Sequence, residues 1–209
     1  MKSVPVPPDR PAARRVAGVI LAAGRSSRMR GANKLLAEVD GAPMVRRVAE
    51  TAVGAGLDPV VVVLGHDAER VHRALEGLPL RFVDNPAYVE GIATSVAAGI
   101  GAVTGRADGA LILLGDMPWV SREDVRALTD AFSPEEGRGI CVPVADGKRG
   151  NPVLWSARYF PELGALEGDV GGRRLLAEHA DDVVEVEVQG EGVLRDVDTP
   201  EVLEAPRTR

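Results

Sequence analysis

Apolar runs alternate with helix-like patterns along most of the chain. Continuous apolar runs occur at 16–22 and within the segments PVVVVLG, LRFVDN, GALILLGD, GICVPV, NPVLW and VVEVEV. Apolar residues recur at helical spacing between them, over residues 43–55, 67–75, 94–103, 156–163 and 172–179, and a further helix is predicted to begin at Ser121. This alternation predicts an α/β fold with a mostly parallel sheet and helices on both of its faces.

Length and composition add limits to this prediction. The chain has 209 residues, which favours one domain over residues 16–209, and its proline-rich, charged start predicts a disordered lead-in over residues 1–15. The net charge of −6 argues against nucleic acid or an anionic membrane as partner. The single Cys141 excludes a disulfide and is expected to be a small buried strand residue. Because no apolar run has membrane-spanning length and no signal peptide is recognisable, we expect a cytoplasmic protein.

The first apolar run leads directly into a small and strongly cationic loop, AAGRSSRMRGANK. Ala22, Ala23 and Gly24 allow a ligand to approach the backbone, whose amides can donate to a phosphate or to a base. The cations that follow, Arg25, Arg28 and Lys34, suit a triphosphate, although a solvated basic loop would have the same residue types. Neither a Walker A pattern nor a GxGxxG fingerprint is present, which argues against a P-loop kinase and a dinucleotide-dependent dehydrogenase.

This loop resembles the signature L-A-A-G-x-S-x-R-M-G-x-x-K of nucleotidyltransferases with a three-layer Rossmann-like fold. The matching residues are Gly24, Ser26, Arg28, Met29 and Lys34, and Arg30 displaces the following glycine by one position. The resemblance implies that Leu21, Ala22, Ala23, Gly24 and Lys34 contact the nucleotide. It also implies that Arg25, Arg28 and Lys34 neutralise phosphate charge during catalysis.

Two aspartates are candidate metal ligands. Asp116 directly follows a buried strand, where a carboxylate suits Mg²⁺, although Gly-Asp-Met-Pro is also an ordinary turn sequence. The tetrad resembles the metal motif of the same family. The segment LRDVDTPE offers Asp196 and Asp198, which would share one face if the segment is extended. It resembles the family's closing motif, which implies that Asp198 is the second Mg²⁺ ligand, although Asp198 could simply cap a last helix.

A further segment, DNPAYVEGIATS, resembles the family stretch N-P-x-x-x-E-G-x-x-x-S. This resemblance implies a nucleotide-side role for Asn85, Gly91, Thr94 and Ser95. Helix capping by Thr94 or Ser95 is the structural alternative.

Two later motifs, RGNPVLW and GDVGGRRLL, resemble the molybdenum cofactor cytidylyltransferases. In that subfamily these segments face the pterin substrate, which implies molybdopterin contacts at Arg149, Gly150, Asn151, Pro152, Asp169, Gly171, Gly172 and Arg173. A glycine-rich entry to a helix binds anions well, and an arginine there can pair with a phosphate; a flexible loop with a surface arginine is the alternative. Ala23 favours CTP, because the guanylyl enzymes usually have glycine at that position.

The resemblance therefore implies transfer of CMP from CTP to the terminal phosphate of molybdenum-molybdopterin, with Mg²⁺ as cofactor. The expected recipient of the product is a molybdoenzyme of the xanthine dehydrogenase type. The alternatives are nucleotidyl transfer with another nucleoside triphosphate or to a sugar or polyol phosphate, and a noncatalytic chaperone of the molybdenum cofactor.

Overall fold

The computed structural model describes residues 14–25, 33–169 and 172–197. Within these ranges, one sheet has the strand order β10-β7-β9-β6-β1-β4-β5, and the short β8 pairs with β7. The bounds of these strands are β1 Val16–Ala22, β4 Val60–Leu64, β5 Arg81–Asp84, β6 Gly109–Leu114, β7 Ile140–Ala145, β8 Lys148–Arg149, β9 Val153–Ser156 and β10 Val183–Glu187. β1 is parallel to β4 and β6, β4 to β5, and β7 to β10, whereas β9 is antiparallel to β6 and β7. The predicted, mostly parallel sheet is confirmed.

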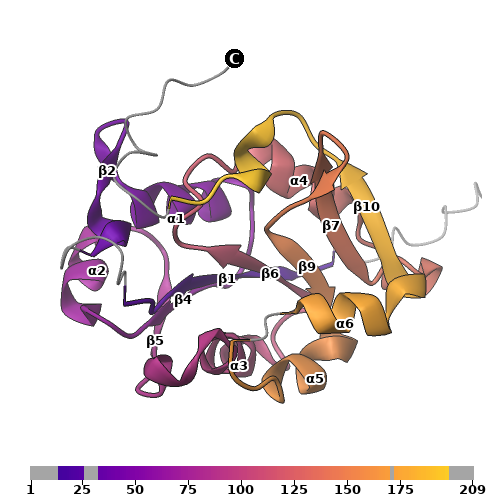
Figure 1. Cartoon of the computed structure of the whole chain (residues 1–209), viewed down its shortest axis with the longest axis horizontal. Helices are drawn as coiled ribbons and strands as arrows, with labels where there is room; N and C mark the ends of the chain where they lie inside the picture. Colours follow the sequence, from indigo (N-terminus) through magenta and orange to yellow (C-terminus); the bar gives the residue numbers. More distant parts are fainter. Residues whose placement is uncertain (1–13, 26–32, 170–171, 198–209) are drawn as a thin grey trace, which may run out of the picture.

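Helices cover both faces of this sheet and complete three layers (Figure 1). One apolar cluster joins the sheet to α1 (Met44–Gly54), α2 (Ala68–Ala74) and α4 (Arg122–Ala131). The cluster on the opposite face includes residues of α3 (Ile92–Val103), α5 (Phe160–Gly164) and α6 (Arg173–Glu178). The predicted three-layer arrangement is therefore confirmed as well.

The central strand β1 explains why the apolar runs are continuous. All seven of its residues are buried, with Ile20 in the cluster of α1, α2 and α4, and Val19 and Leu21 in the cluster of α3, α5 and α6. A strand covered on both faces has no polar side, so its sequence does not alternate. Gly99 of α3 lies so close to Val19 and Val63 that a β-carbon there would clash, which brings α3 close to the sheet.

The structure adds one short hairpin that the apolar pattern did not predict. β2 (Glu38–Val39) pairs antiparallel with β3 (Ala42–Pro43) across Asp40 and Gly41, whose φ angles are 51° and 79°. Asp-Gly favours a two-residue turn with positive φ at both positions, but strands of two residues show too little alternation to be recognised. As a consequence, Pro43 ends β3 and α1 begins one residue later than predicted.

Other local predictions are met. Ser121 precedes α4 and forms a capping box, in which its hydroxyl accepts from Asp124 N at 3.0 Å and Asp124 Oδ2 accepts from Ser121 N at 2.9 Å. Cys141 is fully buried in β7, and this burial raises the pKa of its thiol to about 12.

The predicted lead-in falls outside the described residues up to position 13. Its last two residues are described and are anchored, Arg14 to the carbonyl of Phe132 and Arg15 to Asp108. Across the described residues, none of the helices combines the length and the apolar character that crossing a membrane requires.

Candidate active site

The carboxyl ends of β1, β4 and β6 meet beside the start of the cationic loop. Ala23 prolongs β1, and its carbonyl accepts a hydrogen bond from His66 N at 3.1 Å, while the Leu21 carbonyl accepts from Gly115 N at 3.0 Å. A β-carbon on Gly65 would lie 2.7 Å from that of Ala23, so glycine is required for this close approach. Gly24 and Arg25 follow as exposed residues. Open α/β sheets bind ligands outside these strand ends, so the predicted loop begins at the expected edge.

Lys34 and Asp116 are brought together at this edge. Nζ of Lys34 lies 2.6 Å from Oδ2 of Asp116, and their side chains are 17% and 20% exposed. Lys34 begins a 3₁₀ turn that is anchored by the buried Leu35, whose N–H donates to the side chain of Asn33 at 3.0 Å. Because water reaches this pair only in part, the attraction is screened less than in a surface ion pair. Asp116 is thus a carboxylate that already binds one cation and offers hard oxygen ligands of the kind that Mg²⁺ prefers.

The C-terminal segment runs beside Asp116. Val197 is fully buried, and its N–H donates to the main-chain carbonyl of Asp116 at 2.9 Å. The second predicted metal ligand, Asp198, lies outside the described residues, and so do Arg28 and Gly171. Their roles stay predictions.

Asn85, Thr94 and Ser95, which we predicted on the nucleotide side, form a hydrogen-bonded cluster within the protein. The buried Asn85 amide donates to Thr94 Oγ1 at 2.9 Å and to Ser95 Oγ at 3.0 Å, and its oxygen accepts from Ala87 N at 3.0 Å. Thr94 Oγ1 in turn donates to the carbonyls of Ala87 and Gly91. These contacts fix the connection from β5 to α3. Nucleotide contact by these side chains stays a prediction, because in this structure the Asn85 amide is engaged by the protein itself.

Gly91 has a steric role in the same connection. Its φ is 123°, and a β-carbon there would lie 2.9 Å from Oδ1 of Asp169 and closer still to the carbonyl of Gly168. Ala93 N donates to that carbonyl at 3.1 Å. The first turn of α3 is therefore in direct contact with the loop that leads to α6.

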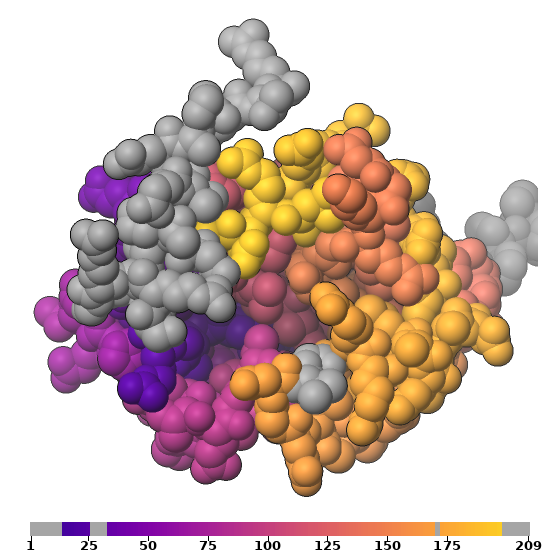
Figure 2. All heavy atoms as spheres, viewed as in Figure 1, coloured from indigo at the N-terminus to yellow at the C-terminus, as the bar shows by residue number. Residues whose placement is uncertain are grey.

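A cavity of about 860 Å³ lies between the sheet, α3 and α6. Six of the residues predicted to bind the pterin line it, together with Leu21 from the nucleotide list: Arg149, Gly150, Asn151, Asp169, Gly172 and Arg173. Pro152 is buried and is not in the lining, and Gly171 is outside the described residues. The corresponding face of the molecule is hollowed near its centre, beside the orange atoms of the α6 region (Figure 2). The motifs RGNPVLW and GDVGGRRLL, which are separate in the sequence, thus line the same cavity.

The chemistry of this cavity is apolar with a few charges. The apolar lining comes from β1, β6, β7, β9, α3 and α6, and includes Trp155 and Leu114. Arg173 and Asp169 bring opposite charges to the α6 side, and Arg149 Nε lies 2.7 Å from Glu185 Oε1 at the other side. Apolar walls with a few placed polar groups are typical of small-molecule sites. Leu21 and Leu114 lie two residues before Ala23 and Asp116, so the cavity extends to the strand ends that precede the cationic loop and the predicted metal ligand.

Apart from Leu21, the apolar residues of this lining were not among the predicted site residues. Trp155 ends the motif RGNPVLW, and an aromatic residue at the end of a predicted strand was the available signal. Ile92, Val96 and Leu176 have the pattern of ordinary helix core residues, so no signal separated them from the core.

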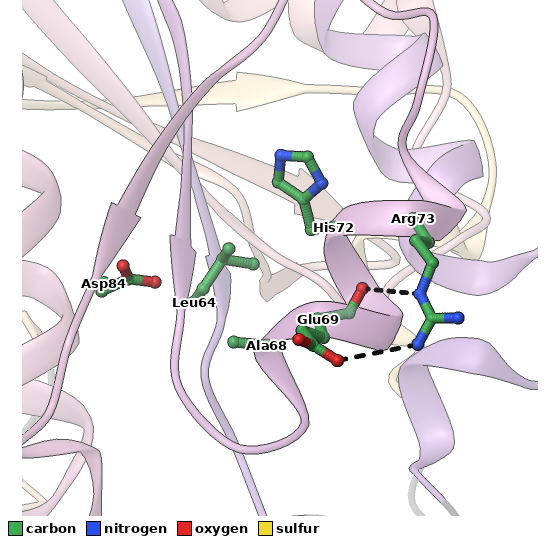
Figure 3. Close-up of a pocket in the computed structure, with 6 residues that line it drawn as sticks. All are labelled: Leu64, Ala68, Glu69, His72, Arg73 and Asp84. Atoms are coloured by element: carbon green, nitrogen blue, oxygen red, sulfur yellow. Dashed lines mark hydrogen bonds and ion pairs between the residues drawn. The ribbon is translucent and has the colours of Figure 1, made fainter.

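A second, more open hollow of about 680 Å³ lies beside the edge strand β5 (Figure 3). It is lined by Leu64, Ala68, Glu69, His72, Arg73 and Asp84. Glu69 and Arg73 pair with each other along α2, and the His72 ring packs on Phe82 with centroids 4.2 Å apart. None of the predicted site residues within the described ranges is in this lining, so the larger cavity is the candidate site.

Comparison with known proteins identifies the family. Residues 18–183 match the MobA-like NTP transferase domain, which is most of the chain. The chain belongs to this family. It is therefore a nucleotidyltransferase of the MobA-like type, and its Rossmann-like architecture agrees with the solved structures of such enzymes.

Individual relatives cover nearly the whole chain. It is 36% identical over 200 residues to the purine catabolism protein PucB of Bacillus subtilis, with 88% of this chain and 92% of PucB covered. It is 30% identical over 191 residues to nicotine blue oxidoreductase of Paenarthrobacter nicotinovorans, with 89% and 93% covered. Rv0371c of Mycobacterium tuberculosis has a crystal structure that superposes with a TM-score of 0.80 at 32% identity, covering 93% of this chain and all of that one. A further structure of Rv0371c is of its complex with manganese.

Proposed function

We propose that this protein transfers CMP from CTP to the terminal phosphate of molybdenum-molybdopterin, forming molybdopterin cytosine dinucleotide and releasing pyrophosphate. The observation that carries the proposal is the position of the 860 Å³ cavity, which joins both pterin-type motifs and reaches the strand ends beside Asp116. A nucleotide at the loop and an acceptor in the cavity would meet there.

The acceptor side of the proposal rests on the lining of the cavity. Apolar walls that include the Trp155 ring suit a flat heterocycle, and Arg173 at the start of α6 suits its phosphate, because a guanidinium forms two parallel hydrogen bonds to a phosphate. The cavity volume of about 860 Å³ is in the range of small-molecule sites.

The nucleotide side rests on the loop after β1. We propose that the backbone from Leu21 to Gly24 contacts CTP, and that Arg25, Arg28 and Lys34 neutralise its phosphates. Mg²⁺ fits Asp116, since a cation already lies against this carboxylate at 2.6 Å and its oxygens are hard ligands. Asp116 and Asp198 would hold the ion, which would supply charge neutralisation at the phosphates. The manganese complex of Rv0371c supports a divalent cation in this family.

The reaction needs no nucleophilic side chain. A terminal phosphate oxygen of the acceptor forms a bond to the α-phosphorus of CTP, and the bond from that phosphorus to the bridging oxygen breaks. Pyrophosphate leaves with the electron pair of this bond. The protein contributes positioning and charge neutralisation, and an in-line displacement requires the acceptor oxygen to lie opposite the leaving pyrophosphate.

The nucleobase and the recipient enzyme are the finer parts of the proposal. Ala23 in the loop favours CTP, by resemblance to the cytidylyl enzymes. For the product we propose a recipient molybdoenzyme of the xanthine dehydrogenase type. Similarity to a protein named for purine catabolism supports such a recipient.

The test is pyrophosphate release by the purified protein with Mg²⁺ and molybdenum-molybdopterin, with CTP, GTP, ATP and UTP supplied in turn. Release with CTP and a cytosine dinucleotide product are expected. Release with GTP alone would retain the mechanism and overturn the base assignment. Release only with a sugar phosphate or a polyol phosphate in place of the pterin would overturn the acceptor. Binding of the pterin cofactor without pyrophosphate release would point to a chaperone instead.

A further inference from the structure

The C-terminal residues 191–197, which we call the strap, connect two parts of the candidate site. At one end, the main chain of Asn151 in the cavity wall donates to the Val193 carbonyl at 2.9 Å. At the other end, Val197 N donates to the Asp116 carbonyl at 2.9 Å. The strap thus lies between the cavity wall at Asn151 and the turn that carries Asp116.

The backbones are packed so tightly along the strap that only glycine fits at two positions. A β-carbon on Gly192 would clash with the carbonyl of Trp119, and one on Gly150 would clash with the carbonyl of Val193. Val193 and Val197 are both fully buried. Small movements of the strap would therefore be transmitted to the Asp116 turn, because close-packed backbones cannot shift independently.

One side-chain contact closes this arrangement. The guanidinium carbon of Arg195 lies 4.5 Å from the centroid of the Trp119 ring, a distance typical of a cation–π contact. Trp119 is three residues after Asp116 and packs with Val197, Val39 and Met44. Its indole nitrogen is buried and has no hydrogen-bond partner among the described residues. Among the described residues, Trp119 therefore interacts with Arg195 through the face of its ring and not through its N–H.

We propose that Arg195 is a positioning residue for the metal-binding carboxylate. By stacking on Trp119, it holds the strap against the Asp116 turn and fixes the backbone of Asp116 between Val197 and Trp119. This inference rests on the proposed function of Asp116 as a Mg²⁺ ligand. It concerns the geometry of that ligand and not the identity of the nucleotide or of the acceptor.

The chain contains a matched control. The guanidinium carbon of Arg158 lies 5.1 Å from the centroid of the Tyr159 ring, in a second arginine–aromatic contact that shares none of the strap's contacts. Arg158 also forms an ion pair with Asp182, so its substitution perturbs the fold at least as much as that of Arg195. Arg195→Gln removes the proposed positioning contact, and Arg158→Gln removes the control contact. Arg195→Lys keeps a cation over the ring, and Trp119→Phe keeps a ring face without the unpaired N–H.

Two readouts are measured on each full-length variant. The first is binding of Mn²⁺ to the protein, from free Mn²⁺ measured by electron paramagnetic resonance, with Asp116→Asn to identify the site. The second is the Mg²⁺ concentration that gives half-maximal pyrophosphate release. We expect Arg195→Gln to weaken both about fivefold, as a contact of about 1 kcal/mol implies. Arg158→Gln should leave the Mn²⁺ affinity and the half-maximal Mg²⁺ concentration unchanged. Arg195→Lys and Trp119→Phe should stay close to the wild type in both measurements.

The outcomes separate this inference from the proposed function. Equal Mn²⁺ binding by Arg195→Gln and the wild type would overturn the positioning role, even if the wild type transfers CMP. Mn²⁺ binding that does not depend on Asp116 would also overturn the positioning role. A wild type that releases no pyrophosphate, but whose Asp116-dependent Mn²⁺ binding is weakened by Arg195→Gln, would overturn the proposed function and retain the positioning role. An equal loss of thermal stability and of Mn²⁺ binding in both arginine variants would indicate a merely structural contact.

Discussion

Two polar groups at the same edge of the sheet behave differently in this structure. The Asn85 amide is buried and uses its hydrogen-bonding groups on Thr94, Ser95 and Ala87. The Lys34–Asp116 pair is partly open to water and consists of two charges that a metal ion and a phosphate can replace. A satisfied neutral cluster stabilises a connection, whereas an exchangeable ion pair can take part in binding. The motifs alone had assigned Asn85, Thr94, Ser95 and Lys34 to the nucleotide and Asp116 to the metal, without separating the two kinds of group.

The largest effect is expected for the exchangeable pair. Asp116→Ala removes the carboxylate that we propose as a Mg²⁺ ligand and should lower kcat for pyrophosphate release by about 1,000-fold, as expected when charge stabilisation is lost. The melting temperature should fall moderately, because the Lys34 ammonium, whose side chain is 17% exposed, loses this carboxylate partner. Asp130→Ala, at an exposed position of α4, is the control and should keep wild-type activity. Near-normal turnover by a folded Asp116→Ala protein would contradict the metal assignment.

The next largest effect is expected for Arg173 in the wall of the 860 Å³ cavity. Arg173 lines the cavity, whereas its neighbour Arg174 pairs with Glu178 and is not in the lining. Arg173→Ala should raise KM for the pterin about tenfold or more and leave KM for CTP unchanged, because a charge-assisted contact to phosphate is lost. Arg174→Ala should behave as the wild type in steady-state kinetics. Equal effects of the two substitutions would argue against a phosphate contact at Arg173.

Substitutions in the hydrogen-bonded cluster of Asn85, Thr94 and Ser95 should lower the stability of the fold rather than the catalytic rate. Asn85→Ala leaves the buried hydroxyl of Ser95 and the N–H of Ala87 without their partner, which should cost about 1–3 kcal/mol of the free energy of unfolding. Ser95→Ala removes one of these hydrogen bonds and should cost less. Chemical denaturation measures both. A stable Asn85→Ala protein that has lost its affinity for CTP would show that the amide serves the nucleotide instead of the fold.

The smallest effect is expected on the pH dependence of stability and concerns Cys141, which is fully buried in β7. Because burial raises the pKa of its thiol to about 12, the folded state keeps the proton while the unfolded thiol, at about 9, loses it. The stabilising contribution of this thiol is therefore complete below pH 9 and falls as the pH rises toward 12. Comparison of the wild type and Cys141→Ala in urea from pH 7 to about 10 measures this difference. A thiol reagent that labels the native protein rapidly at pH 8 would contradict the buried assignment.

Sequence patterns predicted the elements well where burial imposes a period. The continuous run of β1, the helical spacing of α1 and the helix start at Ser121 are local features, encoded within a few adjacent residues. The hairpin of β2 and β3 was missed because each strand is too short to show a period. The two cavity motifs were found by resemblance, and their common location could not be read from spacing along the chain.

The sequence by itself determined the order of the longer strands and helices and placed the cationic loop and Asp116 directly after buried strands. Tertiary structure alone decided that Lys34 contacts Asp116 across 82 positions of sequence and that Asn85, after β5, is engaged by Thr94 and Ser95 of α3. It also decided that β9 inserts antiparallel between β6 and β7, which brings Trp155 into the cavity. The physical reason is that burial periodicity acts within an element. Partners between elements depend on strand order and register, which are set by the packing of the whole sheet.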